Sequence, residues 1–167
     1  MAAPVWSVGQ VLAASDVNNW FVPQVAYRTS NSSQVKSTTL TNDPVLFIPV
    51  AANAAYEFRM YLYAASASTS SGMKIAFTGP AGSSGAFSGA KDNAGGGAFI
   101  NPTSLGVAVS GVVGGTANAN YSSRYYGLFQ TAGTAGNFQF QYAEDATDAV
   151  NGCYVFLQSV LILDRSG

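Results

Sequence analysis

The chain has 167 residues, of which 48% are apolar and only 9% are charged, and its net charge is −1. This length and apolar content predict one domain with one hydrophobic core, and the lack of a basic excess argues against nucleic-acid binding. Because the chain has no histidine and one cysteine, zinc sites built on these residues, Ser-His-Asp and Cys-His catalytic arrangements and an intrachain disulfide are excluded.

Residues 1–23 are predicted to form an apolar amino-terminal arm that contains at most one short helical turn, near residues 15–20. Both tryptophans of the chain lie in this arm, and such aromatic residues often anchor protein interfaces. We therefore predict that the arm docks on another chain, with packing on its own domain as the alternative. The predicted anchoring residues are Val5, Trp6, Val11, Leu12, Trp20 and Phe21.

Residues 24–167 are predicted to form short strands separated by Gly, Ser and Asn turns. Residues 56–63 alternate, with Tyr56 and Phe58 on the core side and Glu57 and Arg59 on the outer side, and residues 73–78 repeat the pattern. Further strands are predicted at residues 25–29, 45–50, 107–113, 125–131, 137–142 and 154–163, with shorter ones near 37–40 and 86–88. This pattern predicts an all-β, antiparallel β-sandwich of the jelly-roll type.

The last predicted strand, residues 154–163, is apolar on both faces. Val155, Leu157, Leu161 and Leu163 would lie on one face, and Phe156, Val160 and Ile162 on the other. A neighbouring subunit is the simplest cover for the second face, and the low charge also favours an assembly. We predict a homo-oligomer with subunit contacts at Tyr61, Tyr63, Tyr125, Phe156 and Ile162.

Two glycine-rich segments, residues 79–101 and 110–120, are predicted to be loops, turns or hairpin tips. The three consecutive glycines at 95–97 do not make a phosphate-binding loop, because no Lys and Ser or Thr follow at the required spacing. We therefore expect no nucleotide cofactor.

The only acidic cluster consists of Glu144, Asp145 and Asp148. Its oxygens could hold Ca²⁺, but the EF-hand spacing is absent, so we predict a solvated loop and no metal. Two carboxylates could also hydrolyse a glycosidic bond if they faced each other across a cleft. Three acidic residues in one loop give no evidence of that geometry. Cys153 adjoins an apolar run without basic neighbours and is predicted to be a buried structural thiol.

Tyrosines recur along the predicted strands, at positions 61, 63, 121, 125, 126 and 142. Their rings could stack on sugars, but we favour cross-strand packing or subunit contact. Glu57 and Arg59 are predicted to take part in cross-strand charge pairs on the outer face.

Residues 9–18, GQVLAASDVN, resemble the opening of small virion proteins of tailed phages that infect actinobacteria, of the minor tail, tail fibre or head decoration type. Residues 38–43 and 49–58 resemble the first half of their β domain, and residues 74–82 and 137–143 resemble its later strands. These motifs are structural, and none carries a catalytic residue.

The resemblance implies a non-enzymatic virion protein that associates, commonly as a trimer, and attaches through its arm to the major capsid protein or to tail proteins. Without heptads, a collagen-like repeat or a second domain, it would form a compact knob rather than a long fibre. Capsid decoration and minor tail protein both remain open. A receptor-binding module for cell-wall glycans is the alternative, and a glycosidase is a third hypothesis.

Residues 1–8 have neither the positive region nor the long apolar region of a signal peptide. The longest apolar run, residues 155–163, is about half a membrane span. We therefore expect a protein that is made in the host cytoplasm, enters the virion and has no membrane partner.

Overall fold

The computed structural model describes residues 7–11, 13–14, 22–33, 35–68, 71–91, 98–113, 120–148 and 150–167. From residue 22 onward, the regular structure of the described residues consists of strands, and every described strand pair is antiparallel. The strands are β1 (Gln24–Tyr27), β2 (Thr41–Val50), β3 (Ala55–Ser66), β4 (Met73–Thr78), β5 (Ser84–Lys91), β6 (Ala98–Ser104), β7 (Val109–Val113), β8 (Tyr121–Gln130), β9 (Gly136–Glu144), β10 (Cys153–Val155) and β11 (Val160–Arg165). The predicted all-β antiparallel class is confirmed.

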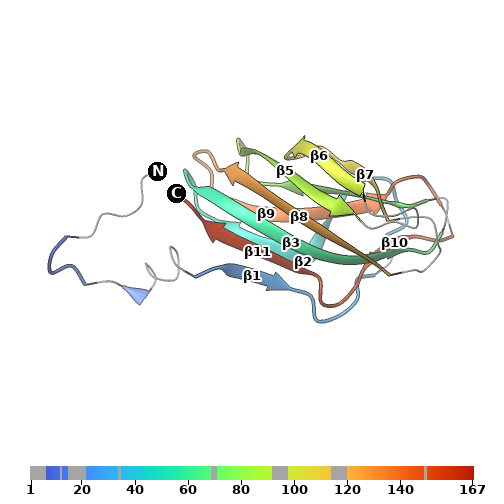
Figure 1. Cartoon of the computed structure of the whole chain (residues 1–167), viewed down its shortest axis with the longest axis horizontal. Helices are drawn as coiled ribbons and strands as arrows, with labels where there is room; N and C mark the ends of the chain where they lie inside the picture. The colour runs from blue at the N-terminus through green and yellow to red at the C-terminus, as the bar shows by residue number, and fades with distance from the viewer. Residues whose placement is uncertain are drawn as a thin grey trace.

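The strands form two sheets that face each other (Figure 1). The larger sheet has the order β1-β11-β3-β8-β5-β6, with β10 also paired to β3, and the smaller sheet has the order β2-β9-β4-β7. Aromatic rings fill the space between them. The ring centroid of Phe58 in β3 lies 4.8 Å from that of Phe77 in β4, and the centroids of Phe129 in β8 and Phe138 in β9 are 4.3 Å apart.

The alternation predicted for residues 56–63 is confirmed. Tyr56 and Phe58 are buried in the core, whereas Glu57 and Arg59 are exposed on the outer face of the larger sheet. Strand β4 has the predicted bounds. Period-two patterning is a local property of the sequence, because successive side chains of a strand point to opposite faces.

Glycines of β5 and β8 lie directly opposite inward-facing rings. Gly127 pairs with Phe87, Gly85 with Phe129, and Gly89 with Tyr125. A Cβ atom at Gly127 would lie 2.4 Å from the carbonyl oxygen of Ala86. The glycines therefore let the two strands and their rings pack closely.

Tyr125 belongs to this buried layer and is only 1% exposed. It lies opposite Met60 of β3 and on the same inner face. A side chain enclosed between the two sheets of its own chain cannot contact a second subunit. The prediction of Tyr125 as a subunit contact is therefore wrong, because the inward alternation of β8 places its ring in the core.

The predicted last strand is divided into β10 and β11. A turn at residues 156–159 separates them, and Gln158 has a φ of 69° there. Ser159 holds the turn against β3, since its Oγ accepts the Tyr63 N–H at 3.0 Å and donates to the Tyr63 carbonyl at 3.1 Å. Val155, Leu161 and Leu163 are buried as predicted, but Leu157 is 43% exposed because it lies in the turn.

Two further differences concern the connections. Residues 37–40 form a bend instead of a strand, and residues 79–101, predicted as a loop or hairpin tip, contain β5 and the start of β6. The sequence of β6, AFINPTS, lacks clear alternation and includes a proline, so its pairing with β5 was not predicted. The predicted helical turn near residues 15–20 lies outside the described residues.

The two ends of the β domain differ in the connections that they carry. The arm leads into β1 at the same end at which the carboxyl terminus leaves β11, and the connections 51–54, 79–83, 105–108 and 131–135 also lie there (Figure 1). Strands β3, β5, β7 and β9 all run towards the opposite end. We call the first end the arm end.

Candidate functional site

The outer face of the larger sheet carries a set of uncovered aromatic and aliphatic side chains, which we call the aromatic face. Its members more than one-third exposed are Val25, Tyr27, Tyr61, Tyr63, Phe99, Tyr126 and Leu128. Pairing aligns them in rows across the strands. Tyr27 lies opposite Val160, which lies opposite Tyr61, and in the next row Ile162 lies between Val25 and Arg59.

The predicted contacts Tyr61 and Tyr63 lie on this face and are 37% and 41% exposed. Ile162 is half-buried in the same face, and Phe156 is half-buried in the turn before β11. The Phe156 ring packs edge-on against Tyr154, with 5.0 Å between the centroids. The structure thus brings Tyr61, Tyr63 and Ile162 together on one surface.

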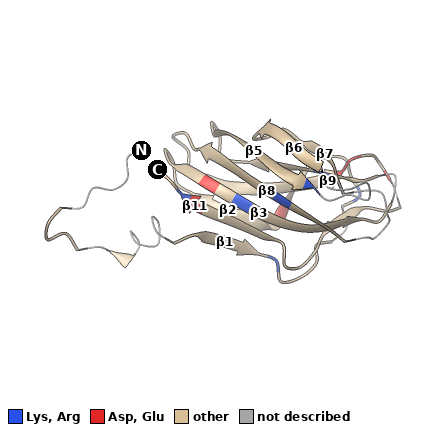
Figure 2. Cartoon of the chain, in the orientation of Figure 1, with Lys and Arg blue, Asp and Glu red and all other residues tan. Residues whose placement is uncertain are grey.

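The charged groups of the aromatic face are balanced in sign. Arg59 of β3 forms an ion pair with Asp164 of β11, and the hydrogen bond to that carboxylate raises the pKa of Arg59. The Arg124 guanidinium lies 5.6 Å from the centroid of the Tyr61 ring, a cation–π arrangement. With Glu57, the face therefore carries two positive and two negative groups. Figure 2 shows that Lys, Arg, Asp and Glu occupy few positions of the two sheets.

A shallow depression of about 300 Å³ lies within this face. Its rim includes Glu57, Arg59, Tyr61, Arg124 and Tyr126. Ring faces, guanidinium donors and a carboxylate form a chemical set that can bind a sugar. Only the outward tyrosines are available for such a role, because the remaining tyrosines of the predicted platform, at 121, 125 and 142, are at most 7% exposed.

The outer face of the smaller sheet provides an internal comparison, since it is mainly polar. Lys74, Thr78 and Gln141 lie outward on β4 and β9, and Gln141 Nε2 donates to Asn42 Oδ1 at 2.7 Å. Its large exposed apolar side chains within the described residues are Val45 and Phe47, each less than 40% exposed. Exposed aromatic residues therefore gather on the larger sheet.

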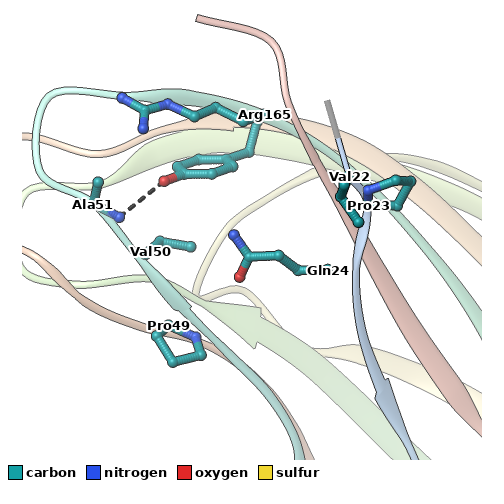
Figure 3. Close-up of a pocket in the computed structure, with 8 residues that line it drawn as sticks. Val22, Pro23, Gln24, Pro49, Val50, Ala51 and Arg165 are labelled. Carbon is teal, nitrogen blue, oxygen red and sulfur yellow. Dashed lines mark hydrogen bonds between the residues drawn. The ribbon is translucent and has the colours of Figure 1, made fainter. Parts of the chain in front are cut away.

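A second hollow lies where the arm joins the β domain (Figure 3). This pocket of about 420 Å³ is lined by residues 22–24, by residues 49–51 at the end of β2, and by Tyr56 and Arg165. The Ala51 N–H donates a hydrogen bond to Tyr56 Oη at 2.8 Å, and this bond holds the Tyr56 ring in the wall of the pocket. The pocket therefore joins the base of the arm to the ends of β2 and β11.

Among the predicted anchoring residues, only Val11 belongs to the described part of the chain, and it is 88% exposed. Val8 is also fully exposed. The other predicted anchors, Val5, Trp6, Leu12, Trp20 and Phe21, lie outside the described residues. Val8 and Val11 therefore have no apolar cover from the β domain, whereas Val22 and Pro23 lie against the ends of β2 and β11.

Two carboxylates of the acidic cluster accept hydrogen bonds from backbone N–H groups of this chain. Asp145 Oδ2 accepts the Gly111 N–H at 2.9 Å, and Asp148 accepts bonds from Val150 and Asn151, which lower the pKa of Asp148 to about 2. Glu144 is fully buried, so the prediction of a solvated loop is wrong for this residue. In the described ranges, no three His, Cys, Asp or Glu side chains gather as a metal site.

Cys153 is fully buried in the core cluster. The predicted burial of this thiol is therefore confirmed. Burial raises the pKa of its thiol to about 12, and the charge of Glu144 adds to the shift. Because the thiolate is the nucleophilic form, Cys153 is a poor nucleophile.

A buried ion pair between Arg28 and Asp43 was not predicted. Arg28 is 3% exposed and Asp43 is 0% exposed, and Arg28 Nε lies 3.2 Å from Asp43 Oδ2. Asp43 Oδ1 also accepts the N–H groups of Val45 and Leu46, at 2.8 and 2.9 Å. An Asn-Asp-Pro sequence such as that at 42–44 favours a local turn, but nothing in it points to Arg28. The ion pair links the residue after β1 to the edge strand β2, and we assign it a role in stabilising the fold.

Comparisons of the chain with protein-family models, curated proteins and solved structures find no match. Over the stretch that the structure describes, no helix combines the length and the apolarity needed to cross a membrane.

Proposed function

We propose that the chain is a non-enzymatic structural protein of a bacteriophage particle, either a capsid decoration protein or a minor tail protein, which attaches through its arm. The observation that carries this proposal is the contrast between the arm and the β domain. Val8 and Val11 are uncovered, whereas the core cluster takes its described members from residues 26–163. We infer that Val8 and Val11 belong to a surface that binds another protein, such as the major capsid protein or a tail protein.

The strand pairing supports a jelly-roll sandwich. Strands far apart in sequence pair in a nested series, β1 with β11, β2 with β9, β3 with β8 and β4 with β7. These pairs alternate between the two sheets, as in a long hairpin rolled on itself, and β5 and β6 form a hairpin inserted at its tip. We infer a jelly roll, a fold found in viral capsid proteins.

The sheet edges favour association through faces rather than by strand addition. Edge strand β2 contains Pro44 and Pro49, edge strand β6 contains Pro102, and edge strand β1 is four residues long. Proline lacks a backbone donor, and short edges offer few unpaired groups to a foreign strand. We therefore infer a homo-oligomer that pairs through side chains. The resemblance implies a trimer.

Deleting residues 2–21 tests the attachment, because this deletion ends before β1. Particles assembled without the native protein would be mixed with the full chain, with the deletion or with Gln10→Ala, a control at a polar arm position. We expect the deletion variant to fold but not to join the particle, while the control joins normally. Normal incorporation of the deletion variant would contradict the proposal.

Glycan binding is the second candidate, favoured by the depression beside Tyr61 and Tyr126. Calorimetry with soluble fragments of the host cell wall tests it. Tyr126→Ala should abolish any binding heat, and Phe47→Ala on the other sheet should leave it unchanged. Absence of binding heat for the native chain would exclude this candidate for the fragments used.

A further inference from the structure

We propose that the aromatic face is the surface on which a second copy of this chain lies. This inference rests on the proposed function for its setting in a particle, but it concerns the purified chain alone. It specifies the contact residues and makes the homo-oligomer a face-to-face dimer, in place of the trimer that the resemblance implies.

The first argument is the uncovered apolar area of this face compared with the rest of the β domain. Phe99 is 90% exposed, Leu128 is 62% exposed and Tyr126 is 56% exposed, and all three lie on one side of the larger sheet. Large exposed apolar patches mark interaction sites, and the fully buried centres of interfaces are rich in tyrosine and arginine. On the outer face of the smaller sheet, by contrast, Val45 and Phe47 are the large exposed apolar side chains among the described residues, and each is less than 40% exposed.

The second argument is charge. Arg59 and Asp164 already neutralise each other across β3 and β11. Of the four charged groups of this face, Glu57 and Arg124 form no ion pair within the described part of the chain. They lie four residues apart along the paired strands, which corresponds to about 13 Å.

A neutral face with separated opposite charges suits a copy of itself. If a second copy lies with its strands reversed, Glu57 of each copy can approach Arg124 of the other. A strongly charged partner such as nucleic acid would gain little from this face, because its charges sum to zero. Complementary charges of this kind set the orientation of two partners more than their affinity.

The third argument is area. Neighbouring strands are about 4.8 Å apart and six residues of a strand span about 20 Å, so five strands present roughly 500 Å². Two copies would then bury on the order of 1,000 Å² in total, at the lower limit for a specific interface. We therefore expect an association that depends on protein concentration.

Sedimentation equilibrium of the full chain over a concentration series up to about 100 µM tests the proposal, because small interfaces dissociate in the micromolar range. Tyr126→Glu should weaken association at least tenfold. The matched control, Phe47→Glu, replaces an exposed aromatic residue on the other sheet and should associate like the native chain. Circular dichroism verifies folding, and Leu128→Ser provides a second variant if Tyr126→Glu does not fold.

Charge reversal tests the orientation. Glu57→Arg and Arg124→Glu should each weaken association, and the double variant should recover it. A native chain that stays monomeric throughout the series would overturn the proposal, as would unweakened association of the folded Tyr126→Glu or Leu128→Ser variant. A monomer that binds cell-wall fragments would assign the face to a glycan instead. None of these results affects the test of arm attachment, so the two proposals can fail separately.

Discussion

Replacing Asp43 with asparagine measures how far the buried ion pair stabilises the fold. Arg28 is 3% exposed and would keep its charge in the interior, without the carboxylate that lies 3.2 Å from its Nε. Breaking a buried pair by removing one partner costs about 3–5 kcal/mol. The Arg28 Nη1 bond to the Ser30 carbonyl, at 3.0 Å, compensates only in part. For a chain of this size, the loss corresponds to a decrease in Tm of roughly 10 °C.

Denaturant unfolding of the native chain, Asp43→Asn and Asp164→Asn gives the comparison. Asp164 pairs with Arg59 on the exposed aromatic face, where screening by water makes an ion pair nearly neutral, so its loss should hardly change the free energy of unfolding. The double variant Arg28→Met with Asp43→Asn should recover part of the loss, because no unpaired charge remains. If Asp43→Asn were no more destabilising than Asp164→Asn, the role assigned to the buried pair would be refuted.

Three further predictions concern the core. Gly127→Ala should lower Tm sharply in a calorimetric scan, because its Cβ would lie 2.4 Å from the Ala86 carbonyl oxygen, whereas Gly133→Ala, with no heavy atom within 4 Å, should not. Leu161→Asp should destabilise the fold far more than Ile162→Asp in urea unfolding, since Leu161 is buried and Ile162 is half-buried on the outer face. The free energy of unfolding should fall as the pH rises from about 9 towards 12, because the unfolded chain loses the Cys153 proton before the folded chain does. Cys153→Ala should make that fall less steep, and an unchanged slope would contradict the raised thiol pKa of about 12.

The sequence predicted the elements in which local alternation decides the structure. Strand β4 has the predicted bounds, and the two faces of residues 56–63 are those observed. The exposure of Tyr61 and Tyr63 follows from the same rule. The outward position of these two tyrosines of the aromatic face could therefore be predicted from period-two patterning alone.

The remaining features depend on contacts between distant segments. Arg28 and Asp43 meet because β1 and β2 lie at neighbouring edges of different sheets, and no pattern within either strand encodes that contact. Tyr125 and Tyr126 are adjacent and equally polar, so the sequence of β8 does not show which ring points inward, whereas the pairing of Tyr125 with Met60 does. Strand β6 exists because β5 provides a partner for it.

The topology also limits how the aromatic face can be covered. The larger sheet receives the inserted β5–β6 hairpin, and its two central strands, β3 and β8, share the longest pairing register of the described structure. The outward residues Tyr61, Tyr126 and Leu128 lie on these central strands, with a paired strand on each side. An apolar surface in the middle of a wide sheet can be covered by the face of another molecule but not by strand addition. The prolines of β2 and β6 and the tyrosines of β3 and β8 therefore favour the same mode of assembly, in which copies meet face to face and the arm end remains available for attachment.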